Sequence, residues 1–363
     1  MWKKLDYSNK EITRAGYKLV DSKATEVERH QSIKVIENWR VAHAFPMNTF
    51  AVNLRRQVSD IDSAIVVQRL KRLDTIRGKM MRFPDMQLHR MQDIGGCRVI
   101  VPTVEDVYRV KERLEKSRIR HEAKTPKDYI KEPNPETGYR GVHLIYKYKS
   151  DKNTYYNGLS VEIQIRTKLQ HLWATAVETV GLFTDNGLKF NQGSQDWLDY
   201  FGLVSELFAI EEGTHPRAND DDYILNLANS ILQLDKKIKA MKKMNIISIV
   251  ARRLGHKSKM KGNGYYLLVL DLDRRRVSVT EFEGVQKGLE EATAAYNEIE
   301  QKRGNKRIDA VLVSAQSYDS MAKAYPNYFA DIREFVKTLL ELLEKHVSRV
   351  TSFETEEELV TAK

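Results

Sequence analysis

The chain has 363 residues, of which 41% are hydrophobic and 30% are charged, and its formal net charge is +10. This length allows two domains, and no apolar run approaches the roughly 20 residues that a membrane-spanning helix needs. Cys97 is the single cysteine, which excludes an internal disulfide and a cysteine-based zinc site within the chain. The polar N-terminus does not resemble a signal peptide, so we expect a cytoplasmic protein with no membrane contact.

The positive charge is concentrated in the first half of the chain. Residues 1–180 contain 34 Lys and Arg against 22 Asp and Glu, a balance of +12. Residues 181–220 contain 2 against 7, and residues 221–363 contain 24 against 21. Such an excess favours a polyanionic partner, either a nucleotide or an RNA, although a solvated lysine-rich surface would give the same count.

Hydrophobic spacing predicts alternating helices and strands in the first half. Residues 1–60 have mostly helical spacing, which Phe45-Pro46 interrupts. The pattern then indicates a mixed sheet wrapped by helices. Its expected elements are strands over 64–70, 97–102, 142–149 and 161–166, and helices over 71–81, 106–116 and 169–180.

The second half reads as a separate α+β unit. An acidic stretch, 211–222, resembles a linker, and a long basic helix is expected over about 223–254. A hairpin over 265–282, a helix over 285–302, a strand over 309–314 and a helix after Tyr328 follow, and both edges of this small sheet could accept another strand. We therefore expect four parts: a first domain over 1–215, a linker and anchoring helix over 216–260, a C-terminal module over 261–350, and a frayed tail over 351–363.

Two carboxylates stand out as candidates for catalysis. Asp93 lies in a glycine-containing turn before a strand, and Glu162 lies on a strand with strict period-2 alternation. Two carboxylates that share a divalent metal, with cations around them, are what phosphoryl-type transfer from a nucleoside triphosphate requires. Taken singly, a surface aspartate and a solvated edge strand explain them as well.

Several aromatic and basic residues lie between or beside these carboxylates. Arg98 could stack its guanidinium on a base, and Tyr139 could stack on the base of an acceptor. Arg140 and His143 could hold phosphates or a ribose, but a lone strand histidine is more often structural. Gln164 and Arg166 share the face of Glu162, so we assign them to acceptor binding.

Upstream cations could form a triphosphate clamp. Arg69 and Lys71 share one face of the expected strand, and Arg72, Arg77 and Lys79 follow on a basic helix. The alternative is an ordinary solvated basic helix.

The segments Asp93–Val99, Lys127–Ile130, Gly138–His143 and Glu162–Thr167 together resemble the RelA/SpoT synthetase domain, over about residues 55–185. That family moves the β,γ-pyrophosphate of ATP onto a ribose 3′-hydroxyl. The resemblance implies Mg²⁺ held by Asp93 and Glu162, which also support proton abstraction, adenine between Arg69 and Arg98, phosphates on Lys71 and Lys79, and the acceptor base on Tyr139.

Other segments resemble CapRel, the fused toxin–antitoxin branch of this family. They are Tyr7-Ser8, Arg14-Ala-Gly16, Glu211–Gly213 and Tyr325-Pro-Asn-Tyr328. The resemblance implies a restrained toxin that pyrophosphorylates the 3′ end of tRNA and so blocks translation. It also implies a zinc-finger-like C-terminal module without zinc ligands, and a ring of Tyr325 or Tyr328 that occupies the adenine site. A phage protein, such as the major capsid protein, would then be the trigger of an antiviral response.

Two other functions stay open at this stage. A small alarmone synthetase would make ppGpp or an adenosine analogue, and a catalytically dead relative would only bind nucleotide or RNA. The chain has Asn134 where alarmone synthetases usually have lysine, and Gly141 where they usually have serine. Both departures weaken the expectation of a guanine-nucleotide acceptor.

Overall fold

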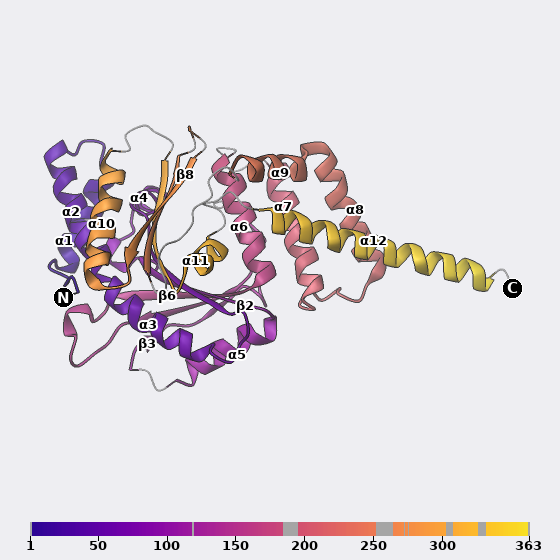
Figure 1. Cartoon of the computed structure of the whole chain (residues 1–363), viewed down its shortest axis with the longest axis horizontal. Helices are drawn as coiled ribbons and strands as arrows, with labels where there is room; N and C mark the ends of the chain where they lie inside the picture. The colour runs from indigo at the N-terminus through magenta and orange to yellow at the C-terminus, as the bar shows by residue number, and fades with distance from the viewer. Residues whose placement is uncertain are drawn as a thin grey trace.

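The structure is a computed structural model, in which one mixed β-sheet runs through both halves of the chain (Figure 1). The order of its strands is β3-β5-β6-β2-β1-β9-β7-β8, and β4 pairs with β5. The β2–β6 pair is parallel and the other pairs are antiparallel. The expected mixed α+β fold is therefore confirmed. The structure describes residues 2–117, 120–183, 195–251, 264–271, 273–274, 276–302, 308–325 and 332–361.

Three helices precede the sheet, as expected: α1 (Asn9–Val20), α2 (Glu26–Ala42) and α3 (Ala44–Gln57). Capping boxes fix the starts of α1 and α2, since Ser8 and Thr25 each exchange hydrogen bonds with a glutamate three residues later. The expected break at Phe45-Pro46 lies earlier, at His43. Pro46 sits in the first turn of α3, where no intrahelical partner is lost.

The first-half strands and helices follow the predicted order. The parallel pair β2 (Gly95–Val101) and β6 (Ser160–Thr167) forms the centre, with β1 (Ile65–Leu70) on one side and β5 (Val142–Lys147) on the other. The remaining elements are α4 (Leu73–Arg82), η1 (Leu88–Arg90), α5 (Val104–Glu115), β3 (Glu122–Ala123), β4 (Lys127–Asp128), η2 (Thr154–Tyr156) and α6 (Lys168–Phe183).

The C-terminal strands continue the sheet. The hairpin β7 (Gly264–Asp271) and β8 (Arg276–Glu283) pairs with β9 (Ile308–Ala315), which pairs with β1. Val313 lies opposite Arg69, and Ser314 lies opposite Gln68. One edge of the C-terminal strands is thus occupied, so the prediction of a small sheet with two open edges is wrong.

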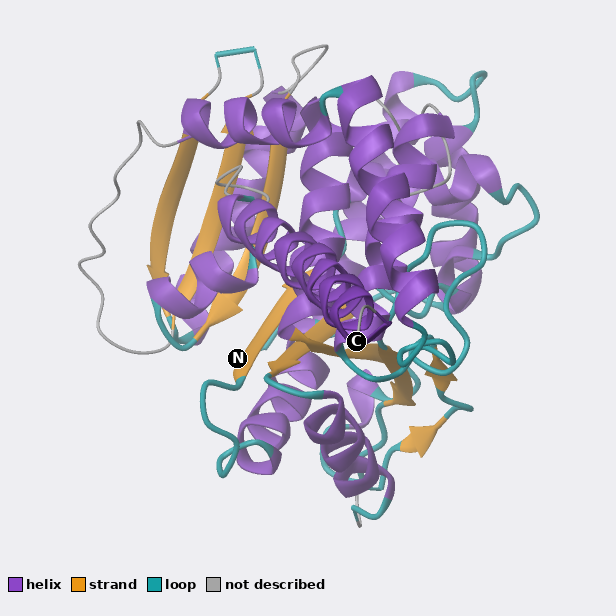
Figure 2. Ribbon diagram, turned by 90° about the vertical axis from the view of Figure 1, so that its right-hand side faces the viewer, coloured by secondary structure: helices purple, strands orange, loops and turns teal. Residues whose placement is uncertain are grey.

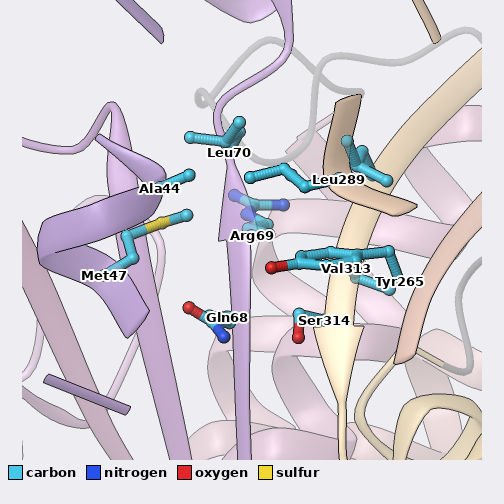
Figure 3. A pocket seen from close by; sticks show the side chains of 10 residues that line it. Ala44, Met47, Gln68, Arg69, Leu70, Tyr265, Leu289, Val313 and Ser314 are labelled. Atoms are coloured by element: carbon cyan, nitrogen blue, oxygen red, sulfur yellow. The ribbon is translucent and has the colours of Figure 1, made fainter. Parts of the chain in front are cut away.

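The joint between the two halves is closely packed. Ala44 and Met47 of α3 face Tyr265 of β7, Val313 of β9 and Leu289 of α10 (Gln286–Lys302) across β1, as Figure 3 shows. The void among these side chains holds about 10 Å³, about the least volume that one water molecule needs. Apolar residues of both halves belong to the same hydrophobic core.

A helical cluster covers one end of the sheet, on the right in Figure 1. Figure 2, viewed from that side, shows its helices packed together. The expected helix over 223–254 is divided at Lys239, whose φ of 56° is left-handed. The cluster consists of α6, α7 (Gln195–Glu211), α8 (Asp221–Ile238), α9 (Ala240–Ala251) and α12 (Arg333–Thr361).

The C-terminal part of the chain is divided between these two bodies. Strands β7 to β9 extend the sheet, and α10 and the short helix α11 (Tyr318–Ala324) pack on it. Helix α12 instead packs on α8, α9 and α6. Helix α12 continues to Thr361, through the segment for which a frayed tail is expected. Among the described residues, none of the helices is both long and apolar enough to span a membrane.

Candidate functional site

A cleft of about 540 Å³ opens where β1, β2 and β6 meet α4 and α6. The register of the strands explains which residues form the bottom of this cleft. Gly96 of β2 lies between Arg69 of β1 and Glu162 of β6, so no side chain separates the two charged groups across the sheet. The residues predicted from the sequence that line the cleft are Arg69, Lys71, Lys79, Asp93, Arg98, Tyr139, His143, Glu162, Gln164, Arg166 and Tyr325.

Asp93 is held by two lysines. Its carboxylate oxygens lie 2.6 Å from Lys71 Nζ and 3.2 Å from Lys79 Nζ. Burial acts to raise the pKa of Asp93, but the charges of the two lysines outweigh it and the pKa is lowered. Lys71 is itself buried, and burial lowers its pKa. A phosphate group could replace the carboxylate as the partner of both ammonium groups.

Glu162 belongs to a hydrogen-bonded chain of polar side chains. His143 Nδ1 lies 3.1 Å from Glu162 Oε1, and Gln164 Nε2 donates to the same carboxylate at 2.8 Å. His143 Nε2 lies 2.6 Å from the Tyr139 hydroxyl, which also accepts a hydrogen bond from Arg166 Nε at 3.0 Å. These contacts fix the directions of the carboxylate and the tyrosine ring together.

The same contacts set the protonation of this chain. Burial acts to lower the pKa of His143, but Tyr139 and Glu162 outweigh it and raise that pKa to about 9. Burial acts to raise the pKa of Glu162, yet the imidazolium and the Gln164 amide hold it well below its usual range. At neutral pH, Glu162 is therefore ionised and His143 is protonated.

The two carboxylates fit a magnesium site completed by substrate. Both line the same cleft and both are ionised, and the charge of Glu162 acts to raise the pKa of Asp93. Among the described residues, no group of three or more His, Cys, Asp or Glu side chains could hold a metal. Mg²⁺ commonly takes one or two carboxylates together with substrate phosphates, and this arrangement needs no third protein ligand.

Tyr325 closes the opposite side of the cleft. Its ring centroid lies 5.2 Å from the Arg98 guanidinium, and the residue is only 2% exposed. Arg98 Nη1 donates to the carbonyl of Ala324 at 2.9 Å, and a ring nitrogen of His171 lies 3.0 Å from the carbonyl of Lys323. The end of α11 is thus bound directly to the side chains of β2 and α6.

Two predicted residues do not join this group. Arg140 lies 2.7 Å from Glu212 in a buried ion pair and donates to Thr214 Oγ1 at 2.5 Å, so it ties its loop to the end of α7 and does not line the cleft. Tyr328 lies outside the described residues.

The structure gives Arg72 a different role from the triphosphate clamp suggested by the sequence, and it adds residues that the sequence did not single out. Arg72 forms ion pairs with Asp309 of β9 and, at 3.9 Å, with Glu178 of α6. This link joins the C-terminal strands to the wall of the cleft, and only the strand pairing reveals it. Residues that line the cleft but were not predicted include Thr75, Arg82, Phe83, Tyr129, Asn134, Glu136, Thr137, Trp173 and Glu178.

Residues 68–181 match the family model described as the region found in RelA / SpoT proteins. This segment contains the end of β1 together with α4, β2 and β6, and therefore most of the cleft, so the RelA/SpoT part of the resemblance is confirmed. The fused toxin–antitoxin branch stays a prediction.

Two curated relatives show how far the sequence similarity extends. Over 112 residues the chain is 37% identical to GTP pyrophosphokinase YjbM of Bacillus subtilis, which covers 30% of this chain and 52% of that protein. Over 129 residues it is 31% identical to an uncharacterized protein of Mycobacterium tuberculosis, which covers 35% of this chain and 43% of that protein. The chain thus spans about half, or less, of the curated relatives it matches.

Among solved structures, the chain is similar to the small alarmone synthetase 1 from Bacillus subtilis bound to its product pppGpp. The TM-score is 0.42 at 24% identity, and the match covers 50% of this chain and 94% of that chain. The small alarmone synthetase 2 from the same organism gives a TM-score of 0.42 at 23% identity, covering 49% and 94%.

Proposed function

We propose that the cleft transfers the β,γ-pyrophosphate of ATP to a ribose 3′-hydroxyl. The observation that carries this proposal is the pairing of two ionised carboxylates with separate cations in one cleft: Asp93 with Lys71 and Lys79, and Glu162 with His143. A transfer between two anionic nucleotides needs this combination of metal ligands and phosphate-binding cations.

Each residue of the cleft has its own role in this proposed reaction. Asp93 and Glu162 hold Mg²⁺, which when bound supplies positive charge at the phosphate oxygens. When ATP binds, Lys71 and Lys79 release the Asp93 carboxylate and bind the β- and γ-phosphates instead. The acceptor 3′-oxygen bonds to the β-phosphorus while the bond from this phosphorus to the α,β-bridging oxygen breaks, AMP leaves, and the hydroxyl proton passes to Glu162.

Tyr139 and Arg166 serve the acceptor in this proposal. Their contact with each other, with the guanidinium 5.0 Å from the ring centroid, leaves the tyrosine fixed and able to stack on a base. The charge balance of residues 1–180 supports an RNA acceptor, and we propose the 3′ end of tRNA. The blocked end could no longer be aminoacylated, and translation would stop.

The alternative acceptor is a guanine nucleotide. Two relatives are named GTP pyrophosphokinases, and they are 37% and 34% identical to this chain over 112 and 113 residues. A small alarmone synthetase would use the same donor chemistry, so only the labelled product separates the two functions.

We further propose that the C-terminal strands and α11 restrain the enzyme as an antitoxin. The buried ring of Tyr325 lies on Arg98, where the adenine of ATP is expected to stack, and this position supports competition with ATP. A phage protein that binds the C-terminal strands better in the open state would release the cleft and stop growth of the infected cell.

The test uses ATP labelled at its γ-phosphate, the full chain and Mg²⁺, with total tRNA or with GDP or GTP. We expect label on the 3′ end of tRNA, more with Tyr325→Ala than with the unchanged chain, and none with Asp93→Asn. Label on GDP or GTP alone would replace the tRNA assignment with the alarmone one. Transfer that persists in Asp93→Asn would contradict the two-carboxylate mechanism.

A further inference from the structure

Helix α4 turns one polar face to the cleft, and this face ends in an aromatic ring. Thr75, Lys79, Arg82 and Phe83 line the cleft at helical spacing i, i+4, i+7 and i+8. Lys79 binds Asp93, and Phe83 lies four residues farther on, about 6 Å along the helix axis. The proposed transfer of pyrophosphate gives no role to this ring.

Phe83 is exposed although it lines the cleft. Phe83 is 54% exposed to solvent. On the same cleft, Trp173 is buried, and Tyr139 is partly buried and packs on the core of the helical cluster. Its backbone is well fixed: its N–H donates to the Lys79 carbonyl at 3.0 Å, and its carbonyl accepts from Met86 at 3.0 Å. Pro84 restricts it further, so a rigid turn presents an apolar ring to water at the mouth of the cleft.

The charges around the ring favour a nucleic acid. Arg82 precedes Phe83 and also lines the cleft, so its guanidinium can contact a phosphate of the strand whose base stacks on the ring. The loop before Tyr139 contributes Asn134 and Glu136 to the cleft. The Asn134 side chain accepts a hydrogen bond from the backbone N–H of Glu136 at 3.0 Å, which fixes this loop in the wall of the cleft.

We propose that Phe83 is a second stacking platform, which binds the base next to the one on Tyr139 and so selects a single-stranded polynucleotide end over a mononucleotide. This inference rests on the proposed use of Tyr139 as the first platform. Every base has a π-face, so the contact needs no particular sequence. Each stacked base adds roughly 1–3 kcal/mol by alanine substitution, which corresponds to about a 5- to 150-fold change in affinity.

The test measures binding apart from transfer. The affinity of the full chain for a fluorescein-labelled single-stranded RNA of eight nucleotides is measured by anisotropy, and its affinity for GDP by calorimetry, both also in the Tyr325→Ala background. We expect Phe83→Ala to weaken RNA binding by about 5- to 150-fold with GDP affinity unchanged, and Phe83→Trp to retain RNA binding. Phe83→Leu should behave like Phe83→Ala, because it keeps an apolar side chain without a ring.

Met81→Ala provides the matched control. Met81 is 62% exposed on the same helix but does not line the cleft, so its loss should change neither affinity. Equal weakening of RNA and GDP, no effect of Phe83→Ala on RNA, or no RNA binding in either background would overturn the proposal. If Phe83→Ala weakens RNA binding selectively while no acceptor takes label from ATP, the stacking platform stands and the proposed function fails.

Discussion

On the Glu162 side of the cleft, the polar side chains form hydrogen bonds with one another. On the Arg98 side, they form hydrogen bonds with the end of α11, which is distant in the sequence. His143, Tyr139 and Arg166 all lie within 27 residues of one another along the chain. Arg98 instead donates to Ala324, which is 226 residues away. One side therefore assembles with the first domain, and the other depends on docking of the C-terminal strands.

This difference means that the residues around Glu162, which form the catalytic geometry, are separate from those around Arg98, which the C-terminal part restrains. A change that undocks α11 should expose Arg98 without disturbing Glu162, because Glu162 is held by His143 and Gln164, which both belong to the first half of the chain. A change in the Glu162 chain should impair the reaction whether or not α11 is docked.

Asp93→Asn should reduce transfer by roughly 100- to 1,000-fold or more, because it removes a metal ligand and its charge. The measurement is label transfer in the Tyr325→Ala background, with circular dichroism to verify folding. Asp74→Asn, at an exposed position of α4, is the matched control and should keep full activity. Near-normal transfer in folded Asp93→Asn protein would remove this residue from the mechanism.

Arg140→Ala should lower the free energy of unfolding by about 3–5 kcal/mol, because it leaves Glu212 buried without its ion-pair partner. Urea unfolding measures this loss, and the double variant Arg140→Met, Glu212→Leu should regain much of it. A stable Arg140→Ala protein that has lost acceptor binding alone would support the acceptor role expected from the sequence.

The raised pKa of His143 predicts that the stability of the protein depends on pH. Its pKa in the folded protein, about 9, lies above the value of about 6.5 in an unfolded chain, so its contribution is complete below pH 6.5 and is lost as the pH rises through 9. The free energy of unfolding of the unchanged chain should therefore fall over this range by up to about 3 kcal/mol more than that of His143→Gln. Parallel curves for the two proteins would mean that burial dominates and His143 is neutral.

Asp309→Asn should loosen the C-terminal strands only slightly, because Arg72 keeps Glu178 as a second partner. A loss of about 1 kcal/mol in docking would raise the apparent affinity for ATP roughly fivefold. Calorimetry with a non-hydrolysable ATP analogue measures this, and the exposed Asp319→Asn serves as the control. No change in affinity would show that this ion pair does not hold the closed arrangement.

Much of the first half could be predicted from the sequence, because its signals are local. The alternation around Glu162 places Gln164 and Arg166 beside it, and helical spacing places Lys79 on the same face of α4 as Thr75. Arg140 could not be assigned in this way. Its direction depends on Glu212, which lies beyond two helices, and no local pattern connects them.

The C-terminal half shows the same limit. Its hairpin and helices were predicted at nearly the right positions, but the pairing of β9 with β1 was not. Both edges of a short three-stranded sheet look alike in the sequence, and only the packing of Tyr265, Leu289 and Val313 on α3 decides which edge is covered. Long-range pairing of this kind determines where Tyr325 lies.

The central claim is that the Tyr325 ring closes the donor side of a cleft that is otherwise formed. Its most direct test is the affinity of three full-length proteins, the unchanged chain, Tyr325→Phe and Tyr325→Ala, for a non-hydrolysable ATP analogue with Mg²⁺. We predict that Tyr325→Ala binds at least about tenfold more tightly, since the binding-competent fraction rises, and that Tyr325→Phe resembles the unchanged chain because the ring remains on Arg98. Equal affinities in all three folded proteins would contradict the account.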